Sequence, residues 1–469
     1  MTRIIGTGIT LLGIVAAAAC SPGEILDVQD PDIIDPGAVE TPAGLTALHA
    51  GAVGDFSFAV VGDAGGTEGQ ILVSGSFSDE LGNSETFPTR REYDQRGPIN
   101  TQNGTLNGVF RNLQRARRAA ERAAGSISRT SATPATDSRI GESFNLAGLT
   151  YVIMGENYCS GVPISEAETD GALTFGDPLT TTELFERAIR NFDSTLTAYP
   201  ANATVTNTAR IGKARALLNL NQPAAAAAEV AAVPTTFSYN TTHTVSLGRQ
   251  QNGVFAFINQ FERFSVANLD GGNGLDFREA MDPRVPWLRL PANDVGFDNL
   301  TPQYDEGKYA SETAPVSIAS GVEARLIEAE AALRAGDDGT WLGILNTLRE
   351  TPGLTPSVFP AAWPASFGFP ELTPLADPGS VTAREDLMFR ERAFWLYLTS
   401  HRLGDLRRLA RQYGREGTGA GGVFPGAGGA PYVIDGNPKG DVFGSEMNLP
   451  IPFDELNNPN FTQCLDRNP

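Results

Sequence analysis

The clearest pattern in the chain is a helical stripe of apolar residues near its C-terminal end. At roughly 100° per residue, the segment 384–411 (REDLMFRERAFWLYLTSHRLGDLRRLAR) places its larger apolar residues within an arc of about 120°, the width of a core-facing stripe. Glu391, Arg402 and Asp405 lie on the same face. Because a buried charge is costly unless it is paired, we expect Arg402 to pair with Glu391 or Asp405. The alternative is a helix that kinks near 400–404 and leaves these charges in solvent.

Helical spacing of apolar residues recurs through the first half of the chain. The segments 45–61, 103–128 and 144–157 each place apolar residues along one side of a helix. An arginine row follows the other side of the second segment, which is typical of a solvated face. The intervening stretch 70–102 mixes short apolar pieces with polar turns, and we expect it to be loop-like.

Paired helices begin near Thr181. A first amphipathic helix, capped by Thr181 or Thr182 and ended by Pro200, leads through a polar link into a second, and Pro223 opens an alanine-rich third. The segment 322–349 repeats this pattern of two helices with small residues where they cross. These echoes predict a mostly α fold built on a tetratricopeptide-like helical repeat scaffold.

Two long irregular stretches interrupt this scaffold, near 234–320 and 351–380. Both are rich in glycine, proline, asparagine and aromatic residues. Long loops inside a compact protein usually carry function, so we expect ligand contacts there. The sequence therefore predicts a single helical domain, 43–469, with long irregular insertion loops at these two places.

Residues 1–19 have the organisation of a bacterial lipoprotein signal peptide. Arg3 precedes an apolar core, and small residues lead to Cys20. Cys20 is then the acylated N-terminus of the mature chain, and 20–42, rich in proline, aspartate and glycine, is a lipid-anchored tether. The alternative is an ordinary cleaved signal peptide with an incidental cysteine. We expect no other stretch to be long and apolar enough to span a membrane.

Net charge limits the possible partners. The chain has 55 acidic and 35 basic residues, a formal net charge of −20 at pH 7. Binding to a phosphate backbone needs a basic surface, so we expect no nucleic-acid partner.

A family resemblance is visible in the C-terminal helix. The matching positions are Glu391, Arg392, His401, Arg402, Asp405, Leu406, Arg407 and Arg408. They resemble the late signature of SusD/RagB-like outer-membrane nutrient-binding lipoproteins. Trp395 and Thr399 stand where that family usually has glutamates, and Ser400 stands where it has glycine.

Three further segments resemble the same family. The ending 450–460 (PIPFDELNNPN) is the most specific of them, the turn 282–284 (DPR) precedes the later helices, and 26–31 (LDVQDP) resembles the opening of mature chains. The resemblance therefore covers essentially the whole mature sequence.

The resemblance implies a SusD-like fold and a nutrient-binding lipoprotein at the outer face of the outer membrane, with no reaction and no cofactor. The implied ligand is a glycan or an oligopeptide. The implied partner is a TonB-dependent SusC-like transporter, over which the protein closes as a lid. Two alternatives stay open: a helical-repeat envelope lipoprotein that acts as a protein-interaction scaffold, and a surface hydrolase.

Motifs for catalysis or metal binding are sparse. His49, His243 and His401 lie far apart, and no zinc-hydrolase, phosphate-loop or nucleophile-elbow motif is present. The run 270–276 (DGGNGLD) could bind calcium, but it lacks the ligand spacing of an EF-hand, and a plain turn is the alternative. The glycine pattern 417–422 follows a helix rather than a strand, which disfavours a dinucleotide site. We expect neither a metal site nor enzyme activity.

Aromatic and polar residues of the loops are the candidates for ligand contact. Sugar rings and planar groups pack on aromatic faces while polar neighbours fix their orientation. The candidates are Phe87, Arg91, Tyr93, Trp287 and Tyr304. Each of them could instead pack within the core or a loop.

The cysteine count predicts one disulfide. Acylation of Cys20 leaves Cys159 and Cys464 in a chain that crosses an oxidising compartment. A bond between them would tie the C-terminal segment to the helical scaffold. Two free thiols are the alternative.

Overall fold

The computed structural model describes residues 41–469, apart from 168–171, 200, 290, 292 and 365–366. The predicted signal peptide, Cys20 and most of the predicted tether lie outside the described residues. The described chain is mostly helical, with short strands, as the sequence predicted. The α-helices are α4 (Pro42–Val61), α5 (Gln70–Phe77), α6 (Pro88–Gln95), α7 (Gly104–Thr130), α8 (Ser138–Asn157), α9 (Thr181–Ala198), α10 (Ala203–Asn219), α11 (Pro223–Val230), α12 (Gly253–Phe255), α13 (Gly321–Arg334), α14 (Asp338–Glu350), α15 (Val381–Trp395) and α16 (Arg402–Tyr413).

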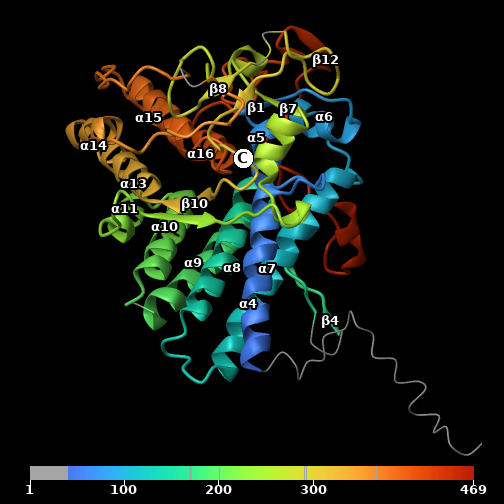
Figure 1. Cartoon of the computed structure of the whole chain (residues 1–469), viewed down its shortest axis with the longest axis vertical. Coiled ribbons are helices and arrows are strands. Elements are labelled where there is room, and N and C mark those ends of the chain that lie inside the picture. The colour runs from blue at the N-terminus through green and yellow to red at the C-terminus, as the bar shows by residue number, and fades with distance from the viewer. Residues whose placement is uncertain (1–40, 168–171, 200, 290, 292, 365–366) are drawn as a thin grey trace, which may run out of the picture.

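Helices that follow one another in the sequence pack side by side. Figure 1 shows α4, α7, α8, α9 and α10 standing together in the lower half of the molecule. Glycines let α8, α9 and α10 approach closely: a Cβ on Gly148 or Gly212 would lie 2.7 or 2.4 Å from the ring of Phe192. A capping box at Thr180 and Glu183 starts α9, so the cap lies one residue before the predicted Thr181.

Most of the short antiparallel ribbons and tight turns lie in the first insertion and toward the upper end of Figure 1, whereas β4 lies in its lower half. The strand pairs are β1 (Leu81–Asn83) with β7 (Phe264–Val266), β2 (Val162–Pro163) with β5 (Pro178–Leu179), β3 (Glu166–Ala167) with β4 (Leu173–Thr174), β6 (Ser238–Thr241) with β10 (Val316–Ser320), β8 (Trp287–Leu288) with β9 (Asp305–Glu306), and β11 (Pro431–Ile434) with β12 (Asn437–Val442). The remaining turns are η1 (Gly248–Gln250), the π-helix η2 (Ala256–Gln260), η3 (Asp270–Gly272) and η4 (Phe453–Asn457).

The stretch 70–102 is more regular than the sequence predicted. It contains α5, β1 and α6, and every residue of α5 is buried. Pro88 starts α6 at a position where a missing N–H costs nothing. The prediction of a loop was wrong because these helices are short and α5 is buried all round, so neither shows a long one-sided stripe.

Helix α4 also departs from expectation. It is long and apolar enough, by length and composition alone, to span a membrane. Its last turn is buried instead, at Phe58, Ala59, Val60 and Val61, and it packs along α7 and α8. It therefore belongs to the group of helices that includes α7 and α8.

The predicted C-terminal helix is interrupted. It ends at Trp395 and restarts at Arg402, and between these points Leu398 and Ser400 have positive φ angles of 51° and 61°. The Leu398 carbonyl accepts a hydrogen bond of 2.8 Å from the Tyr309 hydroxyl. A tertiary contact thus replaces a helical hydrogen bond at the interruption. The charges on both halves nevertheless stay buried.

Arg402 pairs with Asp79, not with Glu391 or Asp405 as the sequence predicted. Its guanidinium donates to both carboxylate oxygens of Asp79, at 2.5 and 2.7 Å, across 323 residues of sequence. The partner comes from the segment after α5, which a helical wheel of 384–411 cannot include. A bidentate pair of this kind satisfies two buried charges at once.

The other two charges have partners of their own. Glu391 accepts from Arg284 of the DPR turn at 2.6 Å and from Arg349 of α14 at 2.7 Å. Asp405 accepts from Arg392 at 2.8 Å. The family-like motif is thus a buried ionic network that joins α14, α15, α16 and the DPR turn.

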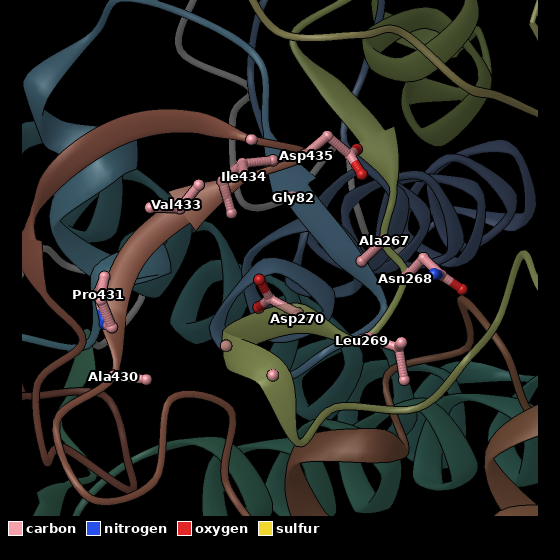
Figure 2. A pocket seen from close by; sticks show the side chains of 13 residues that line it. Gly82, Ala267, Asn268, Leu269, Asp270, Ala430, Pro431, Val433, Ile434 and Asp435 are labelled. Atoms are coloured by element: carbon pink, nitrogen blue, oxygen red, sulfur yellow. The ribbon is translucent and has the colours of Figure 1, made fainter.

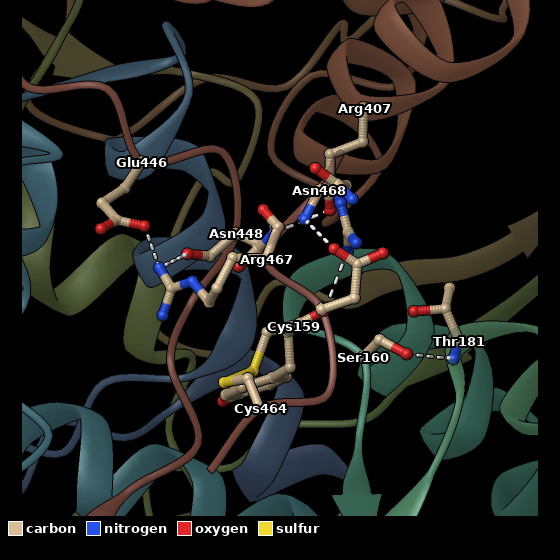
Figure 3. Close-up of a disulfide and its surroundings, with 11 residues drawn as sticks. Cys159, Ser160, Thr181, Arg407, Glu446, Asn448, Cys464, Arg467 and Asn468 are labelled. Atoms are coloured by element: carbon tan, nitrogen blue, oxygen red, sulfur yellow. Dashed lines mark hydrogen bonds and ion pairs between the residues drawn. A yellow bond between two sulfur atoms is a disulfide. The ribbon is translucent and has the colours of Figure 1, made fainter.

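The predicted disulfide is present and fixes the C-terminal segment. Cys159 and Cys464 lie 5.9 Å apart between Cα atoms, 305 residues apart in sequence (Figure 3). Backbone bonds continue the attachment on both sides, since the Ser160 N–H donates to the Asp466 carbonyl and the Leu465 N–H donates to the Ser160 carbonyl. The C-terminal residues are therefore tied to the end of α8.

Candidate functional site

Trp287 and Tyr304, two of the predicted ligand residues, meet in the first insertion. Trp287 begins β8 and Tyr304 directly precedes β9, so the pairing of these strands brings the two rings together. Their centroids lie 5.5 Å apart in an edge-to-face arrangement, and both side chains are half-buried. An edge-to-face pair is a rigid apolar platform.

Two arginines hold this platform. The Arg278 guanidinium lies 3.6 Å from the centroid of the Tyr304 ring, and the Arg289 guanidinium lies 5.5 Å from it. The Trp287 indole N–H donates to the Arg278 carbonyl at 3.1 Å, which fixes the orientation of the ring. The platform therefore combines aromatic surface with cationic hydrogen-bond donors.

Phe87 belongs to a second aromatic group. Its ring is 47% exposed and lies near the Arg90 and Arg263 guanidinium groups, at 5.0 and 5.2 Å. Arg263 also covers the ring of Phe297 at 4.2 Å, and Phe297 is 46% exposed. Arg263 thus stands between two exposed aromatic rings, and it is itself anchored on Glu85.

The two aromatic groups share a polar support. Gln303, next to Tyr304, accepts from the Ser84 hydroxyl at 3.1 Å and donates to the carbonyls of Ile258 and Phe264. The Asp298 N–H, next to Phe297, donates to the Ser84 carbonyl. We call Phe87, Phe297, Trp287 and Tyr304 the aromatic face.

Tyr93 and Arg91 lie differently from what the sequence predicted. Tyr93 is fully buried, so neither face of its ring can stack on a ligand, and we leave it out of the site. Its residue type and loop-like surroundings in the sequence predict ligand contact, yet it sits on α6 and points into the core. Arg91 is on the same helix and is partly exposed; its backbone N–H donates to the Phe87 carbonyl, while its side chain makes no hydrogen bond or ion pair with a described residue.

Acidic groups lie beside the platform. Burial raises the pKa of Asp305 to about 7; a hydrogen bond from Gln303 lowers it, while the charges of Asp294 and Glu262 raise it further. Near neutral pH this carboxyl group can therefore donate a hydrogen bond as well as accept one.

A pocket of about 450 Å³ opens next to the platform, between η3 and the β11–β12 hairpin (Figure 2). Its polar side chains are Asn268, Asp270 and Asp435. Arg278 connects the two places, because the same guanidinium that covers Tyr304 forms an ion pair with Asp435.

The run 270–276, considered for calcium, does not gather its carboxylates. Asp270 is buried in η3, whereas Asp276 pairs with Arg390. Across the part of the chain that the structure describes, no group of three or more histidine, cysteine, aspartate or glutamate residues is placed to hold a metal ion.

The sequence alone missed Phe297, Arg263 and Arg278. Phe297 lies in a turn-rich loop, and only its place in a long insertion could have indicated it. The two arginines become visible only when β7, β8 and β9 come together. The composition of the insertion therefore indicated a segment of interest, but it did not predict which of its residues contact one another.

Comparison with known proteins identifies the fold. No protein-family model matches the sequence, and no curated protein sequence matches it. A SusD superfamily protein from Parabacteroides distasonis superposes with a TM-score of 0.64 at 12% identity, over 90% of this chain and 98% of that chain. The chain has the SusD-like fold.

Other SusD-like structures match over the same extent. A SusD superfamily protein from Bacteroides vulgatus gives a TM-score of 0.60 at 13% identity, over 91% of this chain and 99% of that chain. A laminarin-binding SusD-like protein gives 0.61 at 15% identity, over 90% and 99%. The SusD-like fold therefore covers almost the full length of these proteins.

Proposed function

We propose that this protein is a surface-exposed outer-membrane lipoprotein that binds a glycan at the aromatic face and delivers it to a TonB-dependent SusC-like transporter. The observation that carries the proposal is the Trp287–Tyr304 platform, held by Arg278 within the first insertion of a SusD-like fold. A solved protein of the same fold is described as laminarin-binding, which supports a carbohydrate ligand.

The chemistry of the aromatic face suits a sugar chain. The C–H faces of a pyranose pack on aromatic rings, and guanidinium and amide groups donate to its hydroxyl oxygens. Arg263 and Arg289 supply such donors beside the rings. The site proposed from sequence thus keeps Phe87, Arg91, Trp287 and Tyr304, and gains Phe297. Binding and release at this face require no catalytic group and no cofactor.

The anchor and the partner belong to the same proposal. Cys20 carries the lipid, the residues that follow it form the tether, and the protein faces the cell exterior. Cys20→Ala should release the protein from membranes into the soluble fraction. If the variant stays on membranes when the transporter gene is deleted, the lipid anchor is overturned.

Glycan binding is tested with the detergent-solubilised lipoprotein in affinity electrophoresis against a panel of polysaccharides that includes laminarin. We expect retardation by at least one glycan, and Trp287→Ala should weaken that binding about tenfold, the value of one stacking contact. Phe175→Ala is the matched control, because Phe175 is an exposed aromatic residue beside β4, at the opposite end of Figure 1 from β8.

A protein-interaction scaffold predicts different results. It would bind no member of the panel, and it would co-purify with envelope proteins other than a β-barrel transporter. Equal binding by Trp287→Ala and the wild type would show that the ligand sits elsewhere.

A further inference from the structure

The pocket beside the platform is lined by glycines, by apolar side chains and by three polar side chains. Gly82 of β1, Asn268 and Asp270 lie on one side, and Val433 and Asp435 of the β11–β12 hairpin lie on the other. No lysine or arginine lines it among the described residues. Its volume of about 450 Å³ accommodates one small polar group together with part of a larger ligand.

Two of its three polar side chains are already used by the protein. Asp435 pairs with Arg278. The Asn268 side-chain carbonyl accepts from the backbone N–H groups of Arg278 and Glu279, at 3.1 and 3.0 Å. Neither group therefore needs a ligand.

Asp270 differs from both. Its side chain is only 6% exposed, and its Oδ2 atom makes no hydrogen bond with any described residue. Figure 2 shows its carboxyl group pointing from η3 into the space between β1 and β11. A buried carboxylate oxygen without a donor is costly, so a donor supplied by a ligand would stabilise it.

The surroundings favour a cationic donor over a metal ion. A divalent cation takes several oxygen ligands, and no group of three or more suitable side chains is placed for it in the part of the chain that the structure describes. A primary ammonium group needs fewer charges, because its three N–H bonds can be shared between one carboxylate and main-chain carbonyls. The pocket supplies the carboxyl group of Asp270.

We propose that this pocket binds the primary ammonium group of an amino sugar while the rest of the same glycan rests on the Trp287–Tyr304 platform. The inference rests on the proposed function and names the class of glycan. Arg278 spans the two parts of the site, since it touches Tyr304 and Asp435 at once.

Binding should depend on pH. Burial raises the pKa of Asp270 well above its usual range; the charges of Asp94 and Asp79 raise it further, and Arg96 lowers it. The carboxyl group must lose its proton to pair with an ammonium ion. Affinity should therefore rise with pH as this carboxyl group loses its proton, until the amine itself loses its proton.

The experiment compares two probes that differ only at the nitrogen. Glucosamine tetramer carries free ammonium groups, and N-acetylglucosamine tetramer does not. Calorimetric titration of the detergent-solubilised lipoprotein should show about tenfold tighter binding of the free amine, the value of one charge-assisted hydrogen bond. Asp270→Asn, which is nearly isosteric, should remove that preference and leave the N-acetylated probe unaffected.

A second variant tests the pocket without removing the charge. Val433→Phe places a ring in the space that the amino group would occupy, so it should weaken binding of the glucosamine tetramer and spare that of neutral glycans. Thermal unfolding of both variants checks that they fold.

Each contrary outcome has a separate meaning. If the glucosamine tetramer binds no better than its N-acetylated form while a neutral glycan still depends on Trp287, the amino-sugar inference is overturned and the proposed function stands. If no glycan binds at all, both are overturned. Calcium alone binding to the wild type but not to Asp270→Asn, or tetralysine binding as tightly as the amino sugar, would also overturn the inference.

Discussion

The two charged regions of this molecule treat their charges in opposite ways. Within α15 and α16 and their neighbours, most buried charges meet opposite charges, although Arg407 donates to main-chain carbonyls. We call the paired set the ionic core, and its members are Asp79, Asp282, Arg284, Glu330, Glu391, Arg392, Arg402, Asp405 and Arg408. Beside the aromatic face, Asp270 is equally buried but leaves an oxygen without a donor. Pairing within the protein is therefore typical of the ionic core, and we propose that the unpaired carboxyl group beside the pocket is the place for a ligand.

The pKa shifts show the same difference. Burial by itself raises the pKa of Asp405, but the Arg392 and Arg408 guanidinium groups outweigh it and hold that pKa well below the usual range. For Asp270, burial prevails and the pKa is raised. Two buried aspartates thus differ in protonation because only one of them has cations in contact with it.

The largest expected effect comes from breaking the ionic core. Asp79→Ala leaves Arg402 buried without its partner and should lower the free energy of unfolding by about 3–5 kcal/mol. Urea unfolding followed by circular dichroism measures it. The double variant Asp79→Leu with Arg402→Met should recover most of the loss; a double variant as unstable as the single one would show that the pair itself is not the cause.

Removal of the disulfide should have the next largest effect. Cys159→Ser with Cys464→Ser opens a loop of 305 residues, and we expect a loss of about 2–4 kcal/mol, below the upper estimate of about 6 kcal/mol from chain entropy. Urea unfolding of the wild type with and without reductant gives a second measurement. Identical unfolding curves for all these samples would contradict a stabilising role of the disulfide.

A pH dependence should come from the buried Glu80. Burial raises its pKa to about 8 from an ordinary 4.5. The hydrogen bond from the Leu398 N–H lowers the pKa, and the charge of Asp79 raises it further. Between these values the folded state keeps a proton that the unfolded state has lost. Stability from this group is thus present below about pH 4.5 and is lost as pH rises toward 8, by about 1.4 kcal/mol per pH unit.

Glu80→Gln removes this dependence, so the difference in melting temperature between pH 5 and pH 8 should shrink. Glu371→Gln, in the exposed second insertion, is the control and should leave the difference unchanged. A Glu80→Gln variant with the full wild-type difference would show that Glu80 ionises normally in the folded protein.

The smallest effect on stability is expected at the aromatic face. Phe87 is 47% exposed, so Phe87→Ala should change the free energy of unfolding by less than about 1 kcal/mol. The affinity of the Phe87→Ala variant for the glycan should still fall several-fold if the ring contacts the ligand. A variant with unchanged affinity would remove Phe87 from the site, whereas Phe297→Ala tests the neighbouring ring independently.

The sequence predicted the long amphipathic helices well, and it predicted short helices and contacts between distant segments poorly. Helical spacing predicted α7, α8 and α9, and the cysteine count predicted the bond to Cys464. It failed for α5 and α6, which are too short to show a period, and for Arg402, whose partner Asp79 lies 323 residues away. Side-chain partners of this kind depend on tertiary contacts that no local pattern contains.

The same limit applies to the candidate site. The insertion 234–320 was predicted to contact ligand because of its composition, and it does contain the Trp287–Tyr304 platform. Tyr93 had the same residue type but points into the core. Residue type alone therefore selected plausible side chains, and only the strand pairing of β8 with β9 separated a platform from a packing residue.

The most direct test of glycan binding at this face is a crystal structure of the protein with the panel glycan that binds most tightly. Sugar density should cover Trp287 and Tyr304, and an amino sugar should place its nitrogen within hydrogen-bond distance of Asp270 Oδ2. Density confined to the second insertion, 351–380, or to the helical body formed by α7 to α10 would contradict the assignment.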